Sequence, residues 1–209
     1  MTLELFPGLA TFDSLAGQYF TRPEEARLVA HTFVTHLRGR RVLEPSAGSG
    51  SLVRAALDAG ATSVVAIERD TKWCAELRAR FVSEPVTVLE GDFLAIADGW
   101  LADGTASAFD VVLSNPPYND GLDTEHLSRI VRLGDAISII RTTALAGKHR
   151  RRRVWNQCRL AEVGQWSDRP AFDCASGDGG KIDLCVVRTE RGLPNGTRAS
   201  FFWIDEVRA

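Results

Sequence analysis

The stretch Arg41-Val42-Leu43-Glu44-Pro45-Ser46-Ala47-Gly48-Ser49-Gly50-Ser51 decides the fold. Its first residues predict a short strand, its glycines predict a tight turn, and residues 52–59 predict a helix that ends at Gly60. Glycine lets the backbone approach a ligand closely, and the amino end of a helix offers free N–H groups. The turn lacks the third glycine of the dinucleotide fingerprint, which disfavours hydride-transfer cofactors. Strand, turn and helix together predict a nucleotide-binding βαβ unit.

Two acids follow the next two predicted strands. Residues 63–67 predict a strand that ends in Glu68, about 20 residues after the glycines, where a ribose-binding carboxylate is expected. Residues 85–90 predict a third strand, which leads to Gly91-Asp92-Phe93. Asp92 could accept a hydrogen bond from an adenine amino group, although Gly-Asp is also ordinary turn chemistry. The combination favours an adenosine-containing ligand.

Strands and helices alternate along most of the chain. Thr21 is the expected N-cap of a helix that runs to residue 37, and Thr71 or Asp70 caps a second helix at 71–81. A further helix is expected at 122–133, and a polar loop at 99–108. Strands are expected at 109–113, 136–140 and 182–187, with a short edge strand at 201–204. This order predicts an α/β, Rossmann-like, mainly parallel doubly wound sheet with a C-terminal antiparallel hairpin. We expect one domain, with a lead-in at 1–38, a core at 39–191 and a tail at 192–209.

The sequence Ser114-Asn115-Pro116-Pro117-Tyr118 follows the predicted strand at 109–113. Two consecutive prolines cannot continue a sheet, because both lack the backbone donor and have a fixed φ. Strand pairing should therefore stop at Asn115 and leave a stiff elbow at the carboxyl end of the strand, where ligands bind in open α/β sheets. The elbow presents an amide, carbonyl oxygens and an aromatic ring, an arrangement that suits a planar heterocycle with an amino group.

The composition of the 209 residues is that of a globular protein with a net charge of −2. No global basic field indicates nucleic acid, and the only dense cationic stretch is Lys148 to Trp155. That stretch is either a solvated helix face or a phosphate-contacting surface. The sequence lacks a signal peptide and a membrane-spanning run, so a cytoplasmic protein is expected. The four cysteines are far apart, which predicts reduced, buried thiols and no metal site.

The set of motifs resembles the S-adenosylmethionine-dependent DNA adenine-N6 methyltransferases with the gamma order of motifs. In that family a Phe-Thr-x-Pro segment, a Glu-Pro-x-x-Gly-x-Gly segment and Asn-Pro-Pro-Tyr follow one another. Here the three are Phe20-Thr21-Arg22-Pro23, Glu44-Pro45-Ser46-Ala47-Gly48-Ser49-Gly50 and residues 115–118. The match is good over residues 17–120 and loose beyond them.

The resemblance implies S-adenosylmethionine as cofactor and methyl transfer to the N6 amine of an adenine that is flipped out of DNA. Asn115 and the Pro116 carbonyl would accept hydrogen bonds from the amine, which aims the nitrogen lone pair at the methyl group. Tyr118 would stack on the base, with Phe172 as a second aromatic. The implied catalytic residues are Asn115, Pro116, Pro117 and Tyr118, and the implied substrate-binding residues are Tyr118, Phe172, Lys148, Arg150, Arg151, Arg152 and Arg153.

The same resemblance assigns the cofactor site, in which Glu68 binds the ribose hydroxyls and Asp92 takes the adenine. The implied cofactor-binding residues are Tyr19, Phe20, Thr21, Glu44, Ser46, Ala47, Gly48, Gly50, Glu68, Arg69, Asp92, Phe93 and Asn115.

Three other interpretations remain open. Asn-Pro-Pro-Tyr also serves enzymes that methylate a glutamine amide in a protein, and phosphate contacts do not distinguish DNA from RNA. A non-catalytic nucleic-acid-binding partner subunit is the third. The chain also departs from the family, because only 18 residues, 192–209, follow the last clear strand, where such enzymes carry a target-recognition domain. We therefore expect a minimal enzyme of short or relaxed specificity that would suit a phage or mobile element.

Overall fold

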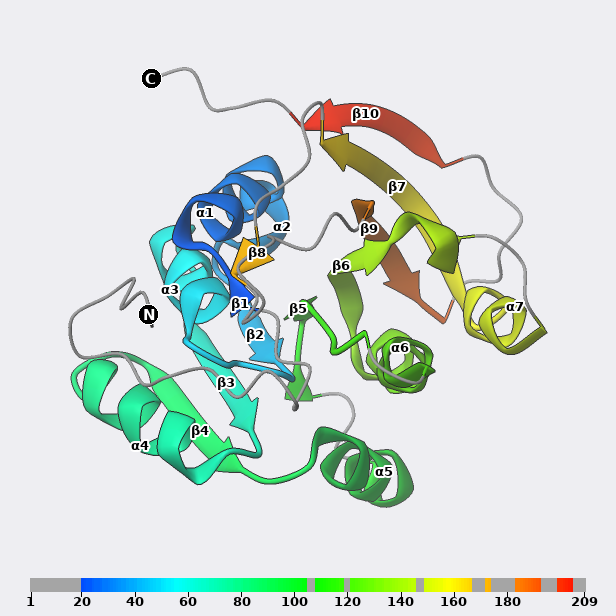
Figure 1. Cartoon of the computed structure of the whole chain (residues 1–209). Helices are drawn as coiled ribbons and strands as arrows, with labels where there is room; N and C mark the ends of the chain where they lie inside the picture. Colours follow the sequence, from blue (N-terminus) through cyan, green and yellow to red (C-terminus); the bar gives the residue numbers. More distant parts are fainter. Residues whose placement is uncertain are drawn as a thin grey trace, which may run out of the picture.

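The protein is described here by a computed structural model of the whole chain (Figure 1). The structure describes residues 20–104, 108–118, 121–145, 149–166, 172–173, 183–192 and 199–204. Tyr19, Lys148 and the expected loop at 174–181 lie outside these ranges. The side chains of residues 149–151 and 172–173 are not described either.

An eight-stranded sheet forms the centre of the molecule, in the order β10-β7-β9-β6-β5-β2-β3-β4. The pairs from β4 to β6 are parallel, β9 is antiparallel to both β6 and β7, and β10 is parallel to β7. The mainly parallel α/β sheet and its antiparallel pair near the C-terminus are therefore confirmed. The strands are β2 (Arg41–Glu44), β3 (Ser63–Glu68), β4 (Val86–Glu90), β5 (Val111–Ser114), β6 (Asp135–Arg141), β7 (Cys158–Trp166), β9 (Leu184–Arg191) and β10 (Ser200–Ile204).

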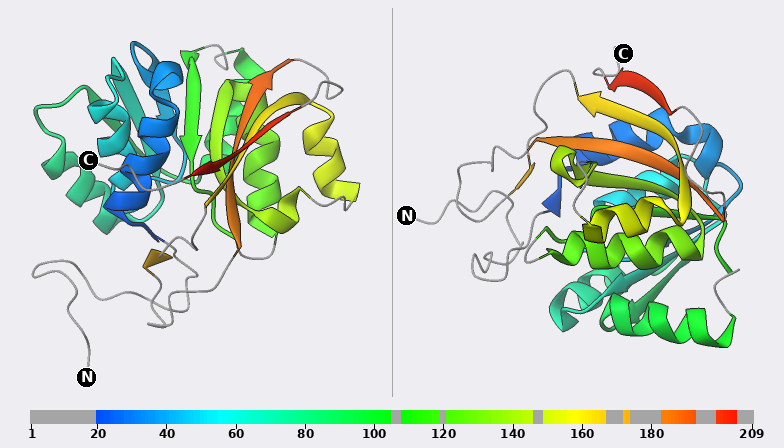
Figure 2. Two further views of the ribbon diagram at one scale, coloured as in Figure 1. Left: turned by 90° about the horizontal axis from the view of Figure 1, so that it is seen from above. Right: turned by 90° about the vertical axis from the view of Figure 1, so that its right-hand side faces the viewer.

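Helices cover both faces of the sheet (Figures 1 and 2). Neighbouring residues of a strand point to opposite faces, so Val42 packs toward α1 and α3 while Leu43 packs toward α5 and α6. Both faces of the central strands are therefore buried, as parallel sheets require. One face carries α1 (Pro23–Thr32), α2 (Val34–Leu37), α3 (Ser51–Asp58) and α4 (Thr71–Arg80), and the other carries α5 (Phe93–Asp103), α6 (Leu122–Leu133) and α7 (His149–Trp155).

Two acids at strand ends start the helices that follow them. The Asp70 carboxylate accepts from the backbone N–H of Lys72 and Trp73 at the start of α4. The Asp92 carboxylate accepts from the Ala95 N–H at the start of α5. Capping by aspartate satisfies N–H groups that have no partner inside a helix. Asp70 is thus the cap of the second helix, one of the two residues expected from the sequence.

The start of the chain differs from the expectation for Thr21. Thr21 lies in a two-residue strand, β1 (Phe20–Thr21), which is antiparallel to β8 (Phe172–Asp173). The N-cap of α1 is Arg22, and no side chain caps this helix. Thr21 fails as a cap because its hydroxyl accepts a hydrogen bond from Asn115, 94 residues away in the sequence. The helix expected up to residue 37 is interrupted at Phe33, where φ is −108°.

Two further elements were not expected. The polar loop predicted at 99–108 is wrong in its first half, because α5 continues through Gly99 to Asp103 and ends at Gly104, which has a φ of +82°. Phe93 and Ala97 bury one side of α5 against the sheet, and this packing outweighs the glycine. The long strand β7 was also missed. The edge strand expected at 201–204 is present as β10, which pairs with β7.

The parallel strands place their carboxyl ends at one edge of the sheet. Glu44, Glu68, Glu90 and Ser114 are the last residues of β2, β3, β4 and β5, so the polar turns that follow them converge there. The described part of the chain contains no helix long and apolar enough to cross a membrane.

Candidate active site

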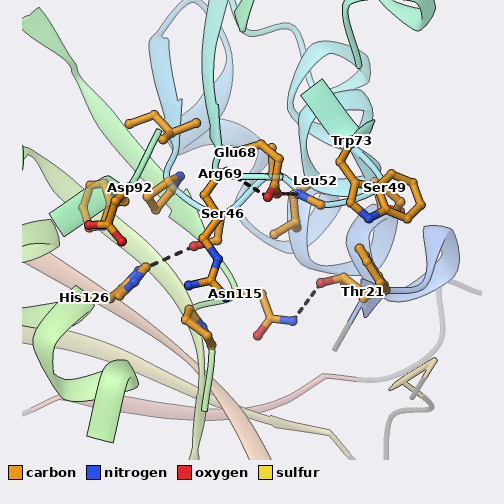
Figure 3. A pocket seen from close by; sticks show the side chains of 18 of the residues that line it. Thr21, Ser46, Ser49, Leu52, Glu68, Arg69, Trp73, Asp92, Asn115 and His126 are labelled. Atoms are coloured by element: carbon orange, nitrogen blue, oxygen red, sulfur yellow. Dashed lines mark hydrogen bonds between the residues drawn. The ribbon is translucent and has the colours of Figure 1, made fainter. Parts of the chain in front are cut away.

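A pocket lies at this edge of the sheet and holds about 1040 Å³ of space outside the protein atoms, part of it open to solvent. In the view of Figure 3, Asp92 and His126 lie at the left and Thr21 at the right, with Glu68 above the centre and Asn115 below it. The lining of the pocket comes from residues 20–21, 45–49, 51–52, 67–69, 73, 91–93, 115, 117, 122 and 126.

Glu68 ties the glycine turn to the end of β3. One carboxylate oxygen accepts from the Gly48 N–H at 2.8 Å, and the other accepts from the N–H groups of Arg69 and Asp70 at 2.9 Å each. A carboxylate offers about four acceptor positions, so three bonds leave roughly one for a ligand hydroxyl. This is the geometry expected for the ribose-binding acid.

The two glycines of the turn are required by their surroundings. Gly48 has a φ of +48°, and a Cβ built on it would lie 2.8 Å from ring atoms of Phe20. Gly50 has a φ of +83°, and its Cβ would lie 2.7 Å from the Leu77 side chain. A side chain at Gly48 would thus fill the space between the turn and β1, where the backbone faces the pocket.

Glu44 is a buried carboxyl with an unused oxygen. Its side chain is 1% exposed, and Oε1 accepts from the Ser46 N–H at 3.0 Å. Oε2 has no hydrogen-bond partner among the described residues. Burial raises the pKa of Glu44 to about 8.

The raised pKa of Glu44 makes the stability of the ligand-free protein depend on pH. Between the ordinary pKa of 4.5 and about 8, the folded state keeps a proton that the unfolded state releases. Stability from this group is therefore complete below about pH 4.5 and decreases as the pH rises toward about 8.

Glutamine cannot ionise, so we expect the stability of Glu44→Gln to lack this decrease with rising pH. The free energy of unfolding of the variant relative to the wild type should rise between about pH 5 and about pH 8, by up to a few kcal/mol at about 1.4 kcal/mol per pKa unit. Urea unfolding at both pH values measures it. A difference between variant and wild type that does not change with pH would contradict the expectation.

The opposite side of the pocket combines an acid, a ring and a histidine. His126 on α6 packs on Phe93 with ring centroids 5.0 Å apart, and its Nδ1 lies 3.5 Å from the Ser46 hydroxyl oxygen. Burial lowers the pKa of His126 to about 4, so the imidazole is neutral near pH 7. With the Asp92 carboxylate in the same lining, this side offers a flat apolar surface and polar groups for a heterocycle.

The elbow after β5 holds Asn115 between two partners. The Asn115 amide nitrogen donates to the Thr21 hydroxyl at 2.9 Å, and the Tyr118 hydroxyl donates to the Asn115 oxygen. Asn115 and Pro117 line the pocket. Tyr118 is 5% exposed and does not line it, so stacking of its ring on a base stays a prediction that the geometry of this structure does not display.

The structure brings most of the expected cofactor residues together. Ten of them line the pocket: Phe20, Thr21, Ser46, Ala47, Gly48, Glu68, Arg69, Asp92, Phe93 and Asn115. Gly50 and Glu44 lie behind this lining, and Tyr19 lies outside the described residues. The backbone of Phe172 is paired with Thr21, so a residue from the second half of the chain reaches the site.

The arginine run occupies a different place from the pocket lining. Residues 149–155 form α7, which packs against α6 and β7, and Arg152 and Arg153 are exposed on it. His126 and Trp73 are pocket residues that were not expected. Neither belongs to a motif, although the position of Trp73 in the first turn of α4, close after the end of β3, would have allowed it to be considered.

A family model described as Conserved hypothetical protein 95 matches residues 13–159. Ribosomal RNA small subunit methyltransferase A of Sinorhizobium medicae is 42% identical over 88 residues, which is 41% of this chain and 30% of that protein. The protein of the same name from Thermosynechococcus vestitus is 37% identical over 105 residues, 49% of this chain and 36% of that protein. The chain thus spans about a third of the length of these curated relatives.

Two solved structures resemble this one over most of the chain. An RNA methyltransferase candidate from Pyrococcus horikoshii has a TM-score of 0.68 at 19% identity, covering 91% of this chain and 95% of that one. A class I S-adenosylmethionine-dependent methyltransferase candidate from Listeria monocytogenes has a TM-score of 0.66 at 12% identity, covering 88% and 65%. These likenesses identify the fold.

The fold and the relatives imply S-adenosylmethionine as the cofactor. The residues of the pocket fit it: Glu68 keeps an acceptor that would bind a ribose hydroxyl, and Asp92 and His126 would flank the adenine. The chain belongs to the family described as Conserved hypothetical protein 95, and it has the fold of the S-adenosylmethionine-dependent methyltransferases.

Proposed function

We propose that this protein transfers a methyl group from S-adenosylmethionine to the exocyclic N6 amine of an adenine in a nucleic acid. The observation that carries the proposal is the Asn115 amide. It lies in the wall of the pocket, at a carboxyl strand end, with its oxygen and nitrogen held in a defined orientation by Tyr118 and Thr21. With the neighbouring Pro116 carbonyl, the amide offers two acceptors, which match the two N–H groups of an exocyclic amine.

The residues of the elbow act by binding and orientation. An adenine amine is a weak nucleophile, because its lone pair is delocalised into the ring. The Asn115 oxygen has a second lone pair beside the bond from Tyr118, and it accepts a hydrogen bond from one N–H of the amine, while the Pro116 carbonyl accepts one from the other. Both bonds favour a pyramidal nitrogen whose lone pair points at the donor. Bound S-adenosylmethionine supplies an electrophilic methyl group on its sulfonium, and correct alignment can contribute about 7–11 kcal/mol. The extra proton leaves to solvent after methyl transfer, when the nitrogen is cationic.

RNA is the first candidate for the polymer, because the curated relatives are named as ribosomal RNA methyltransferases. DNA is the second candidate, because the segment Phe20-Thr21-Arg22-Pro23 precedes the glycine turn and Asn-Pro-Pro-Tyr in the gamma order, and Thr21 contacts Asn115.

Transfer of labelled methyl groups tests the proposal. The full chain is incubated with labelled S-adenosylmethionine and with ribosomal RNA, duplex DNA, single-stranded DNA or a glutamine-containing protein fraction, and the products are digested to nucleosides or amino acids. We expect label in N6-methyladenine. Label in another base or in glutamine, or no transfer to any substrate, would contradict the proposal. The last result would favour a non-catalytic subunit.

The exposed arginines of α7 are the proposed phosphate contacts. We expect Arg152→Ala/Arg153→Ala to weaken polynucleotide binding similarly for all sequences and to reduce the slope of log affinity against log salt by about 2, roughly one for each phosphate that the variant no longer neutralises. Fluorescence anisotropy over a range of salt concentrations measures the slope. Arg38→Ala/Arg40→Ala is the matched control, since both residues are exposed just before β2 and lie outside α7. An unchanged slope in the α7 variant would contradict the assignment.

A further inference from the structure

Behind the Asn115 amide lies a chain of contacts that the proposed chemistry does not use. It runs from Asp123 in the first turn of α6, through Arg141 at the carboxyl end of β6, to the ring of Tyr118. α6 and β6 lie beside the end of β5, so this series of contacts reaches the elbow from the side away from β1 (Figure 1).

The ion pair at the base of this chain is unusually buried for a charged pair. The Asp123 side chain is 0% exposed, and Arg141 donates to its Oδ2 from Nη2 at 2.6 Å and from Nε at 3.2 Å. The Asp123 Oδ1 accepts from the Thr124 N–H at 2.7 Å. The positive amino end of α6 favours the negative charge of Asp123, and the two N–H donors of Arg141 hold that carboxylate in one orientation. The Arg141 side chain is 29% exposed, so only the acid of the pair is fully buried. A pair of this kind gives little stability on average, but its two hydrogen bonds hold the guanidinium in one orientation.

The guanidinium of Arg141 continues the chain to the aromatic ring. Its Cζ lies 5.9 Å from the centroid of the Tyr118 ring, within the range of a cation–π contact. The Tyr118 hydroxyl donates to the Asn115 oxygen and lies 3.5 Å from the Ile139 carbonyl oxygen, so both ends of this side chain are held.

The consequence concerns the plane of the Asn115 amide. The Thr21 hydroxyl accepts a hydrogen bond from the amide nitrogen, and the Tyr118 hydroxyl donates one to the amide oxygen. Rotation of the amide would break both hydrogen bonds. We propose that Tyr118, held by Arg141 and Asp123, is a positioning residue that fixes the plane of the Asn115 amide and, with it, the direction of the oxygen lone pair that remains for the substrate amine. This inference rests on the proposed function and adds a role for the Tyr118 hydroxyl that differs from stacking on the base.

Phenylalanine at position 118 separates the two roles, because it keeps the ring and removes only the hydroxyl. If the hydroxyl positions Asn115, kcat of Tyr118→Phe should fall by about 100-fold, the size of effect that a misplacement of about 1 Å can have. KM for the polynucleotide and the Kd of S-adenosylmethionine should stay within about 2-fold, since the groups that bind either ligand are unchanged. If the ring acts by stacking, Tyr118→Phe should retain the wild-type kcat, and that result would overturn the inference.

Arg141 provides a second, independent measurement. Arg141→Met removes the charge over the ring and should also lower kcat, whereas Arg141→Lys keeps the charge and should restore part of the loss. Because both residues act through the same amide, Tyr118→Phe/Arg141→Met should be little worse than Tyr118→Phe alone. Losses that multiply in the double variant would contradict a shared path.

Arg129→Met is the matched control, since Arg129 also lies on an α6 ion pair, with Asp98 and Glu125, but away from the elbow. It should leave kcat unchanged. Thermal unfolding of each variant checks that the chain is folded at the assay temperature; if Arg141→Met is unfolded, Tyr118→Phe and Arg141→Lys carry the test. The proposed function fails if the wild type methylates no adenine, whereas the inference fails if the wild type is active and Tyr118→Phe is equally active.

Discussion

Replacement of Asn115 by alanine is expected to reduce methyl transfer by at least about 100-fold, comparable with the loss of a hydrogen-bonding group that acts only on the reacting atoms. The variant loses the acceptor that orients the amine, and it leaves the Thr21 hydroxyl and the Tyr118 hydroxyl without their shared partner. Single-turnover transfer of labelled methyl groups to the preferred polynucleotide measures the effect.

The Asn115 variant should keep most of its affinity for the cofactor, because Glu68, Asp92 and the glycine turn form their own contacts. Calorimetric titration with S-adenosylmethionine checks this point. Asn156→Ala is the matched control, since Asn156 is exposed just after α7 and should leave both activity and binding unchanged. An Asn115→Ala protein that transfers methyl groups at the wild-type rate would remove the basis of the proposed function.

Replacement of Glu68 by alanine is expected to weaken cofactor binding by about 100-fold. The variant loses the acceptor for the ribose hydroxyl, and it also releases the N–H of Gly48, which Glu68 ties to the end of β3. Hydrogen bonds to a charged group contribute about 1.5–3 kcal/mol each, so the loss of one or two accounts for an effect of this size. Calorimetric titration of the ligand-free protein provides the dissociation constant.

Glu68→Gln should bind with intermediate affinity, because glutamine keeps one acceptor oxygen, whereas its amide nitrogen cannot accept from the backbone N–H groups that the other carboxylate oxygen serves. Glu24→Ala is the control, since Glu24 is exposed in the first turn of α1 and pairs with Arg27. Equal affinities of Glu68→Ala and the wild type would show that the cofactor does not use this end of β3.

The sequence allowed the pocket to be predicted wherever a residue type followed directly from its position at a strand end. Gly48, Glu68 and Asp92 fall into this class, because a parallel sheet brings successive carboxyl ends to one edge. His126 could not be predicted in this way, since it lies inside an amphipathic helix and becomes a pocket residue only through the packing of α6. The Arg141–Asp123 pair is similar, because it joins two elements whose neighbourhood is set by the order of strands.

The two wrong predictions of secondary structure, at Thr21 and at residues 99–108, have a related cause. Thr21 precedes Arg22-Pro23-Glu24 and has the local signature of a helix cap, but a tertiary hydrogen bond to Asn115 draws it into β1. Gly99 made residues 99–108 resemble a loop, whereas the apolar side of α5 is buried against the sheet. In both cases, contacts between distant segments outweighed a local preference.

The position of β9 has a consequence for the way the chain acquires its structure. Although β9 is nearly the last strand in the sequence, it lies between β6 and β7 in the sheet. Along the chain β7 therefore precedes both of its sheet partners, β9 and β10. Pairing between segments that are distant in the sequence slows folding relative to local pairing.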